Sequence, residues 1–436
     1  MTASGASHSR SFRLLLHLPA VRALLDACER IECHLVGGVL RDRALGLQSH
    51  DIDAVVAGRA DWSGLQVAER LAAALPARLV LLGGKEFAAY RLVAAGLTVD
   101  LWDRQGMTLH DDLARRDFTV NAFALDLADG AVIDPFGGLA DLDRRLLRAT
   151  TPESFAGDPL RVLRLPRLLL RLPGFAADPD TLGLAHQAAP RLGEVAAERV
   201  RDELAILFAH PEAHRGLALL TALDIYPGLW LGRPGEPGRT EGAMAELEAL
   251  PERIRELREI DAAAAEAVDA AAARLAATFA HLPFEALEKF RDAGYLTRQE
   301  TAKIALLLGW EELPASELGQ RRFLHRAGPL WATAVAAVGA RAVGAALGRW
   351  RAALRPLLEL ARREGEALID PPRLLTGGEV QELLGIPAGP AVGRALAAIR
   401  EAQVDGRVRT REEAVALLEG GRTTDEHGQS TRTNTD

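Results

Sequence analysis

The stretch HLVGGVLRDRALGLQSHDIDAVV, residues 34–56, decides the fold of the N-terminal part of the chain. It predicts an apolar strand that ends at Gly37 and Gly38, then a short helix, and then a second strand that carries Asp51 and Asp53. Residues two apart in a strand point to the same face, so these two carboxylates project together. Two neighbouring carboxylates repel each other unless a cation lies between them.

A hard divalent cation such as Mg²⁺, which prefers oxygen ligands, would resolve this repulsion. The glycine pair lets the backbone approach a phosphate closely, and Arg41 lies in the first turn of the helix that follows. Asp100, in LTVDLW, supplies a third acid on another predicted strand. Alone, an Asp-x-Asp pattern is more often a turn cap followed by a solvent-facing residue. Next to a phosphate-binding glycine turn, it points to nucleotidyl transfer.

The composition narrows the class of protein. The chain has 436 residues, too many for one ordinary core, and its hydrophobic content of 48% is typical of folded globular proteins. A net charge of −8 argues against a generally basic nucleic-acid coat, although local basic clefts remain possible. Cys28 and Cys33 have no partners at zinc spacing. We expect a cytoplasmic protein without a targeting signal or a membrane span.

The sequence pattern changes near residue 150. Before it, predicted strands and helices are mixed, which is typical of a small α/β or α+β domain. After it, nearly every segment has helical periodicity. Residues 232–242, GRPGEPGRTEG, read as a linker or an exposed loop.

Several ordered blocks resemble the class II tRNA nucleotidyltransferases, also called CCA-adding enzymes, together with the bacterial poly(A) polymerases. Their order, spacing and number make the resemblance specific, while the helical stretch between 210 and 374 matches weakly. The blocks are LVGGVLRDRALGLQSHDID (35–53), DDLARRDFTVNAFALD (111–126), IDPFGGLADLDRRLLR (133–148), GDPLRVLRLPR (157–167), ERVRDEL (198–204) and LLTGGEVQELLGIPAGPAVGRAL (374–396).

The resemblance implies an α+β nucleotidyltransferase head with a mixed sheet, followed by all-α parts. The implied segments are a head with an N-terminal extension (1–150), a helical neck that holds the base-reading helix (151–215), a helical body (216–370), a helical RNA-binding tail (371–420) and a disordered end (421–436).

The implied activity is template-independent addition of C (CC, or CCA) from CTP or ATP to the 3′ end of tRNA, with release of pyrophosphate. In this family's two-metal mechanism, Asp51 and Asp53 would bind two Mg²⁺ ions, and Asp100 would be a third catalytic carboxylate. No protein partner is implied. The remaining implied nucleotide contacts in the head are Gly37, Gly38, Arg41, Arg116 and Asn121.

The fourth block suggests how the base is read. Asp158, Arg161, Arg164 and, less strictly, Arg167 recur every three residues on one side of a predicted helix. Cytosine and adenine share an exocyclic amine beside a ring-nitrogen acceptor, whereas uracil and guanine present a carbonyl and an N–H there. The resemblance implies that Asp158 and Arg161 read this edge, so that a wrong base would leave buried polar groups unpaired. Arg164 would help to hold the nucleotide. A solvated helix face is the plainer explanation of the same spacing.

The chain departs from the family pattern at three places. Gly157 stands where the family usually has Glu, and Pro166 is expected to interrupt the base-reading helix. The link between Asp100 and Arg115 is shorter than the flexible loop of many members. A short link resembles members that add only the two cytidines.

Other functions stay open from the sequence. An A-adding enzyme or a poly(A) polymerase would share every motif, and an RNA-binding protein with an inactive head is more distant. A phosphohydrolase would use the His-Asp pairs at 50–51 and 110–111, but both lie in the strand-rich head and are expected off helices. Arginines that could contact RNA phosphates are Arg144, Arg145, Arg148, the arginines of 161–171 (Arg161, Arg164, Arg167 and Arg171), Arg394, Arg400, Arg407 and Arg409.

Overall fold

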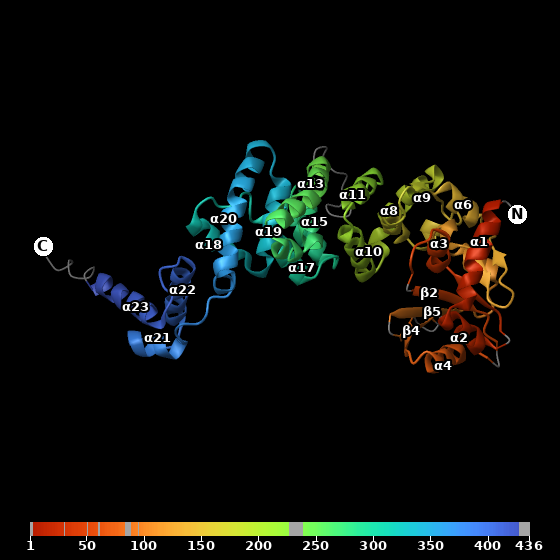
Figure 1. Ribbon diagram of the computed structural model, residues 1–436, viewed down its shortest axis with the longest axis horizontal. Coiled ribbons are helices and arrows are strands. Elements are labelled where there is room, and N and C mark those ends of the chain that lie inside the picture. Colours follow the sequence, from red (N-terminus) through yellow and green to blue (C-terminus); the bar gives the residue numbers. More distant parts are fainter. Residues whose placement is uncertain are drawn as a thin grey trace. The chain divides into compact units, whose positions relative to one another are not determined.

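The computed structural model contains two compact units, Met1–Leu207 with Leu219–Leu229 and Phe208–Ala218 with Trp230–Asp436 (Figure 1). The residues that it describes are 3–29, 31–49, 51–59, 62–82, 89–94, 96–225 and 239–426. No helix of this described part is long and apolar enough to cross a membrane.

A seven-stranded mixed sheet forms the centre of the first unit, with the strand order β3-β4-β5-β2-β1-β6-β7. Strands β2 and β5 are parallel, and the other neighbouring pairs are antiparallel. The predicted α+β head with a mixed sheet is therefore confirmed. The strands are β1 (Cys33–Val36), β2 (Asp51–Val56), β3 (Arg78–Leu82), β4 (Ala89–Ala94), β5 (Leu97–Asp103), β6 (Ala124–Asp126) and β7 (Val132–Ile133).

Helices pack on this sheet because their apolar sides match its buried faces. Helix α4 begins with a capping box between Ser63 and Gln66, and it buries Val67 and Leu71. It packs on β3, β4 and β5, beside α2 (Figure 1). The helices of the head are α1 (Ala3–Arg13), α2 (Pro19–Cys28), α3 (Gly38–Ala44), α4 (Gly64–Ala74), α5 (Leu109–Ala114) and α6 (Gly138–Arg144).

Asp103 fixes the end of strand β5. Its carboxylate accepts hydrogen bonds from the backbone N–H groups of Gly58 (3.1 Å), Gly64 (2.8 Å) and Gln105 (3.0 Å). The chain then reaches α5 through residues 104–108 only. The link that the sequence predicts to be short is thus a tight turn, and Asp103 anchors its N-terminal end.

The helices after the head include α8, which carries the predicted base-reading side chains. Pro166 does not interrupt it: α8 runs unbroken from Arg161 to Arg171, so that expectation is wrong. A short parallel pair, β8 and β9, also departs from the all-α expectation. The elements are β8 (Leu146–Leu147), α7 (Ser154–Gly157), α8 (Arg161–Arg171), β9 (Ala176–Ala177), α9 (Pro179–Ala188), α10 (Ala197–Ala209) and α11 (Ala213–Ala222).

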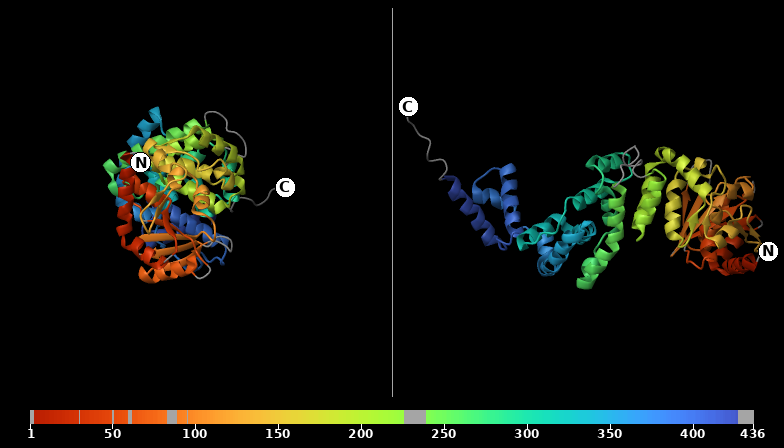
Figure 2. Two further views of the ribbon diagram at one scale, coloured as in Figure 1. Left: turned by 90° about the vertical axis from the view of Figure 1, so that its right-hand side faces the viewer. Right: turned by 90° about the horizontal axis from the view of Figure 1, so that it is seen from above.

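The second unit is helical wherever the structure describes it from residue 239 onward (green to blue in Figure 2). The expected loop at 232–242 is partly wrong, because 239–242 begin α13; residues 232–238 lie outside the described residues. The helices before the tail are α13 (Arg239–Ile260), α14 (Ala262–Glu266), α15 (Ala270–Phe279), α16 (Phe284–Asp292), α17 (Arg298–Leu308), α18 (Glu317–Ala327), α19 (Trp331–Arg341) and α20 (Gly344–Ile369).

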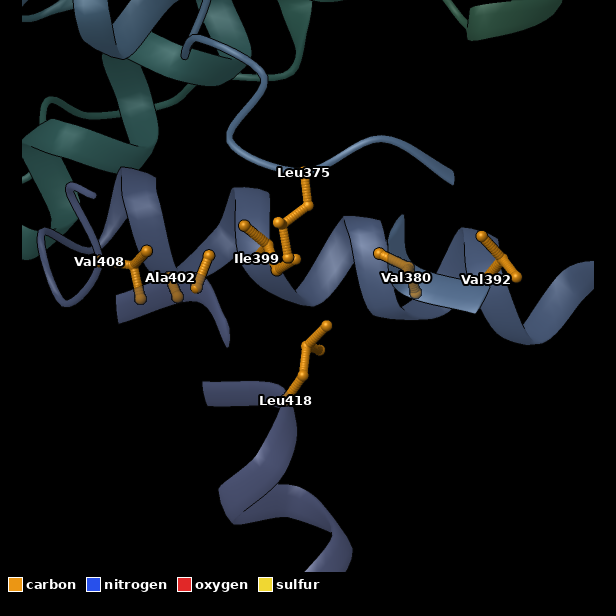
Figure 3. Close-up of a cluster of buried hydrophobic side chains, with 8 residues drawn as sticks. Leu375, Val380, Val392, Ile399, Ala402, Val408 and Leu418 are labelled. Carbon is orange, nitrogen blue, oxygen red and sulfur yellow. The ribbon is translucent and has the colours of Figure 1, made fainter. Parts of the chain in front are cut away.

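The last three helices, α21 (Gly377–Leu384), α22 (Pro390–Val404) and α23 (Arg411–Glu426), share a small apolar core. Figure 3 shows its members Leu375, Val380, Val392, Ile399, Ala402, Val408 and Leu418. Because α23 extends to Glu426, the disorder expected for 421–436 is wrong for its first part, and 427–436 lie outside the described residues. The finer division into head, neck, body and tail stays a prediction.

Candidate active site

The glycine turn lies directly against one of the predicted acids. Strand β1 ends at Val36, Gly37 adopts φ +74°, and α3 begins at Gly38. A Cβ atom on Gly37 would lie 2.7 Å from Oδ2 of Asp53, which is closer than atoms can pack. Both the backbone angle and the space therefore require glycine at position 37.

The acids lie in one row across neighbouring strands. The parallel pairing of β2 and β5 places Asp100 directly opposite Asp53, and the pairing of β4 and β5 places Arg91 opposite Asp100. Asp51, two residues from Asp53 on β2, lines the same cavity of about 450 Å³ as these three side chains. The structure thus brings the three predicted acids to one cavity, together with an arginine that was not predicted.

The surroundings of Asp53 disfavour its charge. Burial raises the pKa of its carboxyl, and the charges of Asp100 and Asp51 raise it further. Arg116 and the N–H of Gly38 lower this pKa, but the net shift is upward. A negative charge is therefore held here at a cost that a bound cation would offset.

The donor set fits a divalent ion held by Asp51 and Asp53. Both are oxygen donors on the same side of β2, and the pKa of Asp53 is raised, chiefly by burial, so its charged form lacks full compensation from the protein alone. The two carboxylate oxygens of Asp100 are instead bound to Arg91, at 2.7 Å from Nε and 2.7 Å from Nη2. Accordingly, no group of three or more acidic, His or Cys side chains among the described residues is arranged to hold an ion.

A second cavity, of about 410 Å³, lies on the other side of Asp53. It is lined by Gly37 and by Arg116, whose guanidinium contacts Asp112 at 3.0 Å. An ideal Cβ on Gly37 would lie 3.2 Å from Nη1 of Arg116, so this guanidinium also faces the glycine turn. The residues that line both cavities are Gly38, Asp53, Asn121 and Arg164.

Arg41 and Asn121 belong to a buried network behind the glycine turn. Arg41 donates to the carboxylate of Asp42 (2.8 and 2.6 Å) and to Oδ1 of Asn121 (2.8 Å). The amide of Asn121 donates in turn to Asp117 (2.9 Å). Arg171 reaches the other oxygen of Asp42 from α8, at 2.6 Å. The network ties α3 to the RRDFT segment and to α8, while Arg41 and Asn121 still line the cavity wall.

Three arginines of α8 are held by acids. Arg164 contacts Asp117 at 3.0 Å and Glu203 at 3.9 Å, and Arg167 contacts Glu203 at 2.6 Å. Arg171 is the third, and it contacts Asp42 at 2.6 Å. This spacing brings Arg164, Arg167 and Arg171 to the wall of the first cavity.

Asp117, which binds Arg164, is a buried acid of this group. Burial by itself would raise the pKa of its carboxyl, but Arg164, the Asn121 amide and the N–H of Phe118 together outweigh burial and lower it. A carboxyl with a lowered pKa in the folded state stabilises the fold above its ordinary pKa. That stabilisation is lost as the pH falls through the pKa of the folded state.

We expect Asp117→Asn to lower the stability of the first unit at pH 7 by about 1–3 kcal/mol, because charged hydrogen bonds are lost. The difference from the unchanged protein should shrink as the pH falls below the ordinary carboxyl range. Thermal unfolding at pH 7 and at a pH below the ordinary Asp pKa of 3.8 measures both effects. Equal melting temperatures at pH 7 would contradict the stabilising role of this carboxylate.

Asp158 and Arg161 line a third cavity, of about 790 Å³. The carboxylate of Asp158 accepts a hydrogen bond from Arg199 at 2.9 Å. Nη1 of Arg161 donates to the backbone oxygens of Arg116 (3.3 Å) and Ser154 (2.8 Å), while its buried Nε has no hydrogen-bond partner in the described structure. Arg161 also lines the second cavity, so it lies where the two cavities meet.

Gly157 leaves open space beside this pair. It lines the third cavity, and no atom lies within 4 Å of the position where its Cβ would be. The Glu that the family usually has at this position would therefore project into free volume.

The His-Asp pair at 110–111 lies on helix α5, so the expectation that it would lie off a helix is wrong. Both side chains are exposed, and Nδ1 of His110 is 3.8 Å from Oδ1 of Asp111. His50 lies outside the described residues.

Three of the RNA-contact candidates outside α8 have acidic partners. Arg148 contacts the buried carboxylate of Asp141 at 2.8 Å, Arg400 lies 3.9 Å from Asp370, and Arg407 lies 3.4 Å from Asp405. The Arg148 contact supports the fold of the head, since Asp141 also accepts from Thr119. Which arginines contact RNA stays a prediction.

Sequence reasoning missed several charged residues of the site: Arg91, Asp42, Asp112 and Glu203. Asp42 and Glu203 pair with partners far along the chain, and no local spacing shows this. The ERVRDEL block was recognised without assigning a role to its Glu203. Arg91 carried a signal, because it is a lone charge in the apolar strand AYRLVA.

The comparisons with known proteins agree on the family. Residues 33–148 match the Poly A polymerase head domain, and residues 174–230 match the probable RNA and SrmB-binding site of polymerase A. A CC-adding tRNA nucleotidyltransferase of Geobacter sulfurreducens is 31% identical over 431 residues, covering 92% of this chain and 94% of the relative. An A-adding tRNA nucleotidyltransferase of Deinococcus radiodurans is 33% identical over 432 residues, covering 88% and 94%.

A solved structure has the same fold. The Bacillus stearothermophilus CCA-adding enzyme in complex with CTP superposes with a TM-score of 0.65 at 26% identity, covering 94% of this chain and 100% of that one.

Proposed function

Because this chain belongs to the tRNA nucleotidyltransferases, we propose that it adds cytidine from CTP to the 3′ end of tRNA without a template. The observation that carries the proposal is the contact between the Gly37 turn and Asp53 at the meeting point of two cavities. One cavity can take a nucleoside triphosphate while the other takes the RNA end. A tRNA substrate also favours a cytoplasmic location.

The reaction joins the RNA 3′-hydroxyl oxygen to the α-phosphorus of the nucleotide. The bond from the α-phosphorus to the bridging oxygen breaks, pyrophosphate leaves with the electron pair, and the hydroxyl proton passes to solvent. Asp51 and Asp53 would hold two Mg²⁺ ions. When bound, these ions would lower the pKa of the hydroxyl and offset the charge of the triphosphate.

The triphosphate would lie against the glycine turn. Gly37 and Gly38, at the start of α3, line the second cavity together with Arg116, so a phosphate bound there would approach the first N–H groups of the helix. Arg41 and Asn121 hold the turn from behind through their buried hydrogen bonds. A phosphate would thus meet backbone donors and a guanidinium that are already oriented.

The base would be read by Asp158 and Arg161. Among the residues that the structure describes, the buried Nε of Arg161 has no hydrogen-bond partner, which suits a ring-nitrogen acceptor, while its Nη1 donates to backbone oxygens. Asp158 would exchange its contact with Arg199 for the exocyclic amine of the base. Arg164 and Arg167, already bound to acids, would support the nucleotide side of α8.

The preference for cytidine rests on the link between β5 and α5. Residues 104–108 span it, and Asp103 anchors its start through three backbone N–H groups. Such a short link has little conformational freedom to change the nucleotide site from one that accepts cytosine to one that accepts adenine. We therefore infer addition of two cytidines, with A addition left to another enzyme.

The proposal is tested with labelled CTP or ATP and three tRNA acceptors, which end before the first C, after one C and after two. We expect CTP incorporation on the first two acceptors, ending after the second C, and none on the third. ATP incorporation on the CC-ended tRNA would instead make this an A-adding or CCA-adding enzyme, as the A-adding relative allows. Long A tails on unrelated RNA would indicate a poly(A) polymerase. Absence of incorporation with every pair would leave an RNA-binding protein with an inactive head.

A further inference from the structure

Arg91 and Asp100 form the outer part of the row of charges that contains Asp53. The three residues are direct partners on β4, β5 and β2, so their side chains emerge on one face of the sheet. Neighbouring strands lie about 4.8 Å apart, which keeps Asp100 within reach of an ion held at Asp53. Its position in the sheet suits metal binding, but both of its carboxylate oxygens are bound by Arg91.

The contact between Arg91 and Asp100 uses both oxygens of the carboxylate. Nε and Nη2 of Arg91 each donate at 2.7 Å, the two-pronged geometry of a strong arginine–carboxylate pair. This hydrogen bonding is the main cause of the raised pKa of Arg91. A cation approaching Asp53 would have to compete with the guanidinium for Asp100.

The exposure of the two side chains shows which partner can move. The Arg91 side chain is 45% exposed, whereas that of Asp100 is 15% exposed. Arg91 lines the first cavity, and its contact with Asp100 uses Nε and Nη2 of the guanidinium. A phosphate group entering this cavity could accept the same pair of N–H groups that Asp100 accepts.

We infer that Arg91 is a positioning residue that withholds Asp100 from the metal site until a phosphate draws the guanidinium away. Asp100 then turns toward Asp53 and joins the cation. The phosphate is an ester group in the first cavity, that of the RNA end or that of the nucleotide. The inference rests on the proposed function, because it assumes the cation at Asp51 and Asp53.

The test measures Mn²⁺ binding to the full-length protein by electron paramagnetic resonance, which reports free Mn²⁺. We expect Arg91→Ala to bind Mn²⁺ about ten-fold more tightly than the unchanged protein, a size typical of residues that support metal ligands. Arg91→Ala combined with Asp100→Asn should return binding to the original value. Arg349→Ala removes an exposed pair with Glu312 in the second unit and should leave binding unchanged.

Two further arms identify the phosphate. An unlabelled tRNA that lacks its 3′ CCA, and CTP alone, are each added to the unchanged protein and to Arg91→Ala. After correction for the Mn²⁺ that the tRNA or CTP binds by itself, the ligand that supplies the phosphate should tighten Mn²⁺ binding to the unchanged protein. The same ligand should not tighten Mn²⁺ binding to Arg91→Ala. If Arg91→Ala unfolds at a lower temperature than the unchanged protein, Arg91→Gln is used in its place, because glutamine keeps the aliphatic part of the side chain.

The outcomes separate this inference from the proposed function. If the unchanged protein binds Mn²⁺ and Arg91→Ala binds it equally or more weakly, the inference is overturned while the metal site stands. If tighter binding persists when Asp100 is also replaced, Arg91 acts by charge alone and the inference is again overturned. If neither the unchanged protein nor Arg91→Ala binds Mn²⁺, the metal site of the proposed function fails.

Discussion

Replacing Asp53 by asparagine is expected to abolish nucleotide incorporation, by about a thousand-fold or more, and to raise the melting temperature of the metal-free protein. The loss of activity follows from the loss of the cation ligand, because metal assistance contributes several kcal/mol to such displacements. The gain in stability follows from the raised pKa of the buried Asp53 carboxyl. Asn keeps the shape of Asp and removes the charge that burial disfavours.

The sign of the pH dependence can be stated in advance. An acid whose folded-state pKa is raised favours the fold at low pH, and this contribution is lost as the pH rises through the folded pKa. The free energy of unfolding of the metal-free unchanged protein should therefore fall below that of Asp53→Asn by an amount that increases with pH. This difference should narrow when Mg²⁺ is added, since only the unchanged protein gains from the ion.

Incorporation assays and thermal unfolding across pH measure the two effects. Asp292→Asn, an exposed acid at the end of α16, is a control that should move neither. RNA binding by Asp53→Asn should stay near normal. Full activity in Asp53→Asn would contradict the metal mechanism. A lower melting temperature of the metal-free variant would contradict the view that the buried Asp53 charge destabilises the fold.

The second large effect is expected for Gly37→Ala, which should lower activity about a hundred-fold. Its Cβ would lie 2.7 Å from Oδ2 of Asp53, so the carboxylate must move away from the glycine turn. A displacement of about 1 Å at a reacting centre costs rates of this order. The backbone at Gly37, with φ +74° and ψ −145°, lies in a sparsely populated region and adds strain of roughly 1–3 kcal/mol for any other residue.

Gly46→Ala provides a matched control for this variant. Gly46 has nearly the same backbone angle, φ +70°, but no atom lies within 4 Å of the position of its Cβ. It should therefore lose comparable stability and keep its activity. Equal activity losses in the two variants would show that backbone strain, and not the contact with Asp53, disables the site.

The core of the site could be predicted from the sequence because its signals are local. The strand before Gly37 and the strand that carries Asp53 follow from apolar runs broken by glycines, and the two-residue period places Asp51 beside Asp53. The structure has each of these elements. The change from strands to helices near residue 150 was visible in the same way.

Other parts of the site depend on pairings that no local pattern contains. The contact of Arg91 with Asp100 needs the register of β4 against β5, which depends on the packing of the whole sheet. Arg41 was predicted to face a phosphate, but its guanidinium is bound within a buried network because Asp42 and Asn121 are its neighbours in space. Pro166 was expected to break a helix, yet the buried leucines on either side keep α8 continuous.

The anchoring of β5 by Asp103 has a consequence for how specificity can diverge in this lineage. The strand that carries Asp100 is fastened at Gly58 and Gly64 before the link to α5 begins. Extra residues inserted near Gly106 would therefore lengthen the link without loosening the acids. A longer loop from a relative could therefore be inserted at this turn to change nucleotide specificity without displacing the carboxylates of the site.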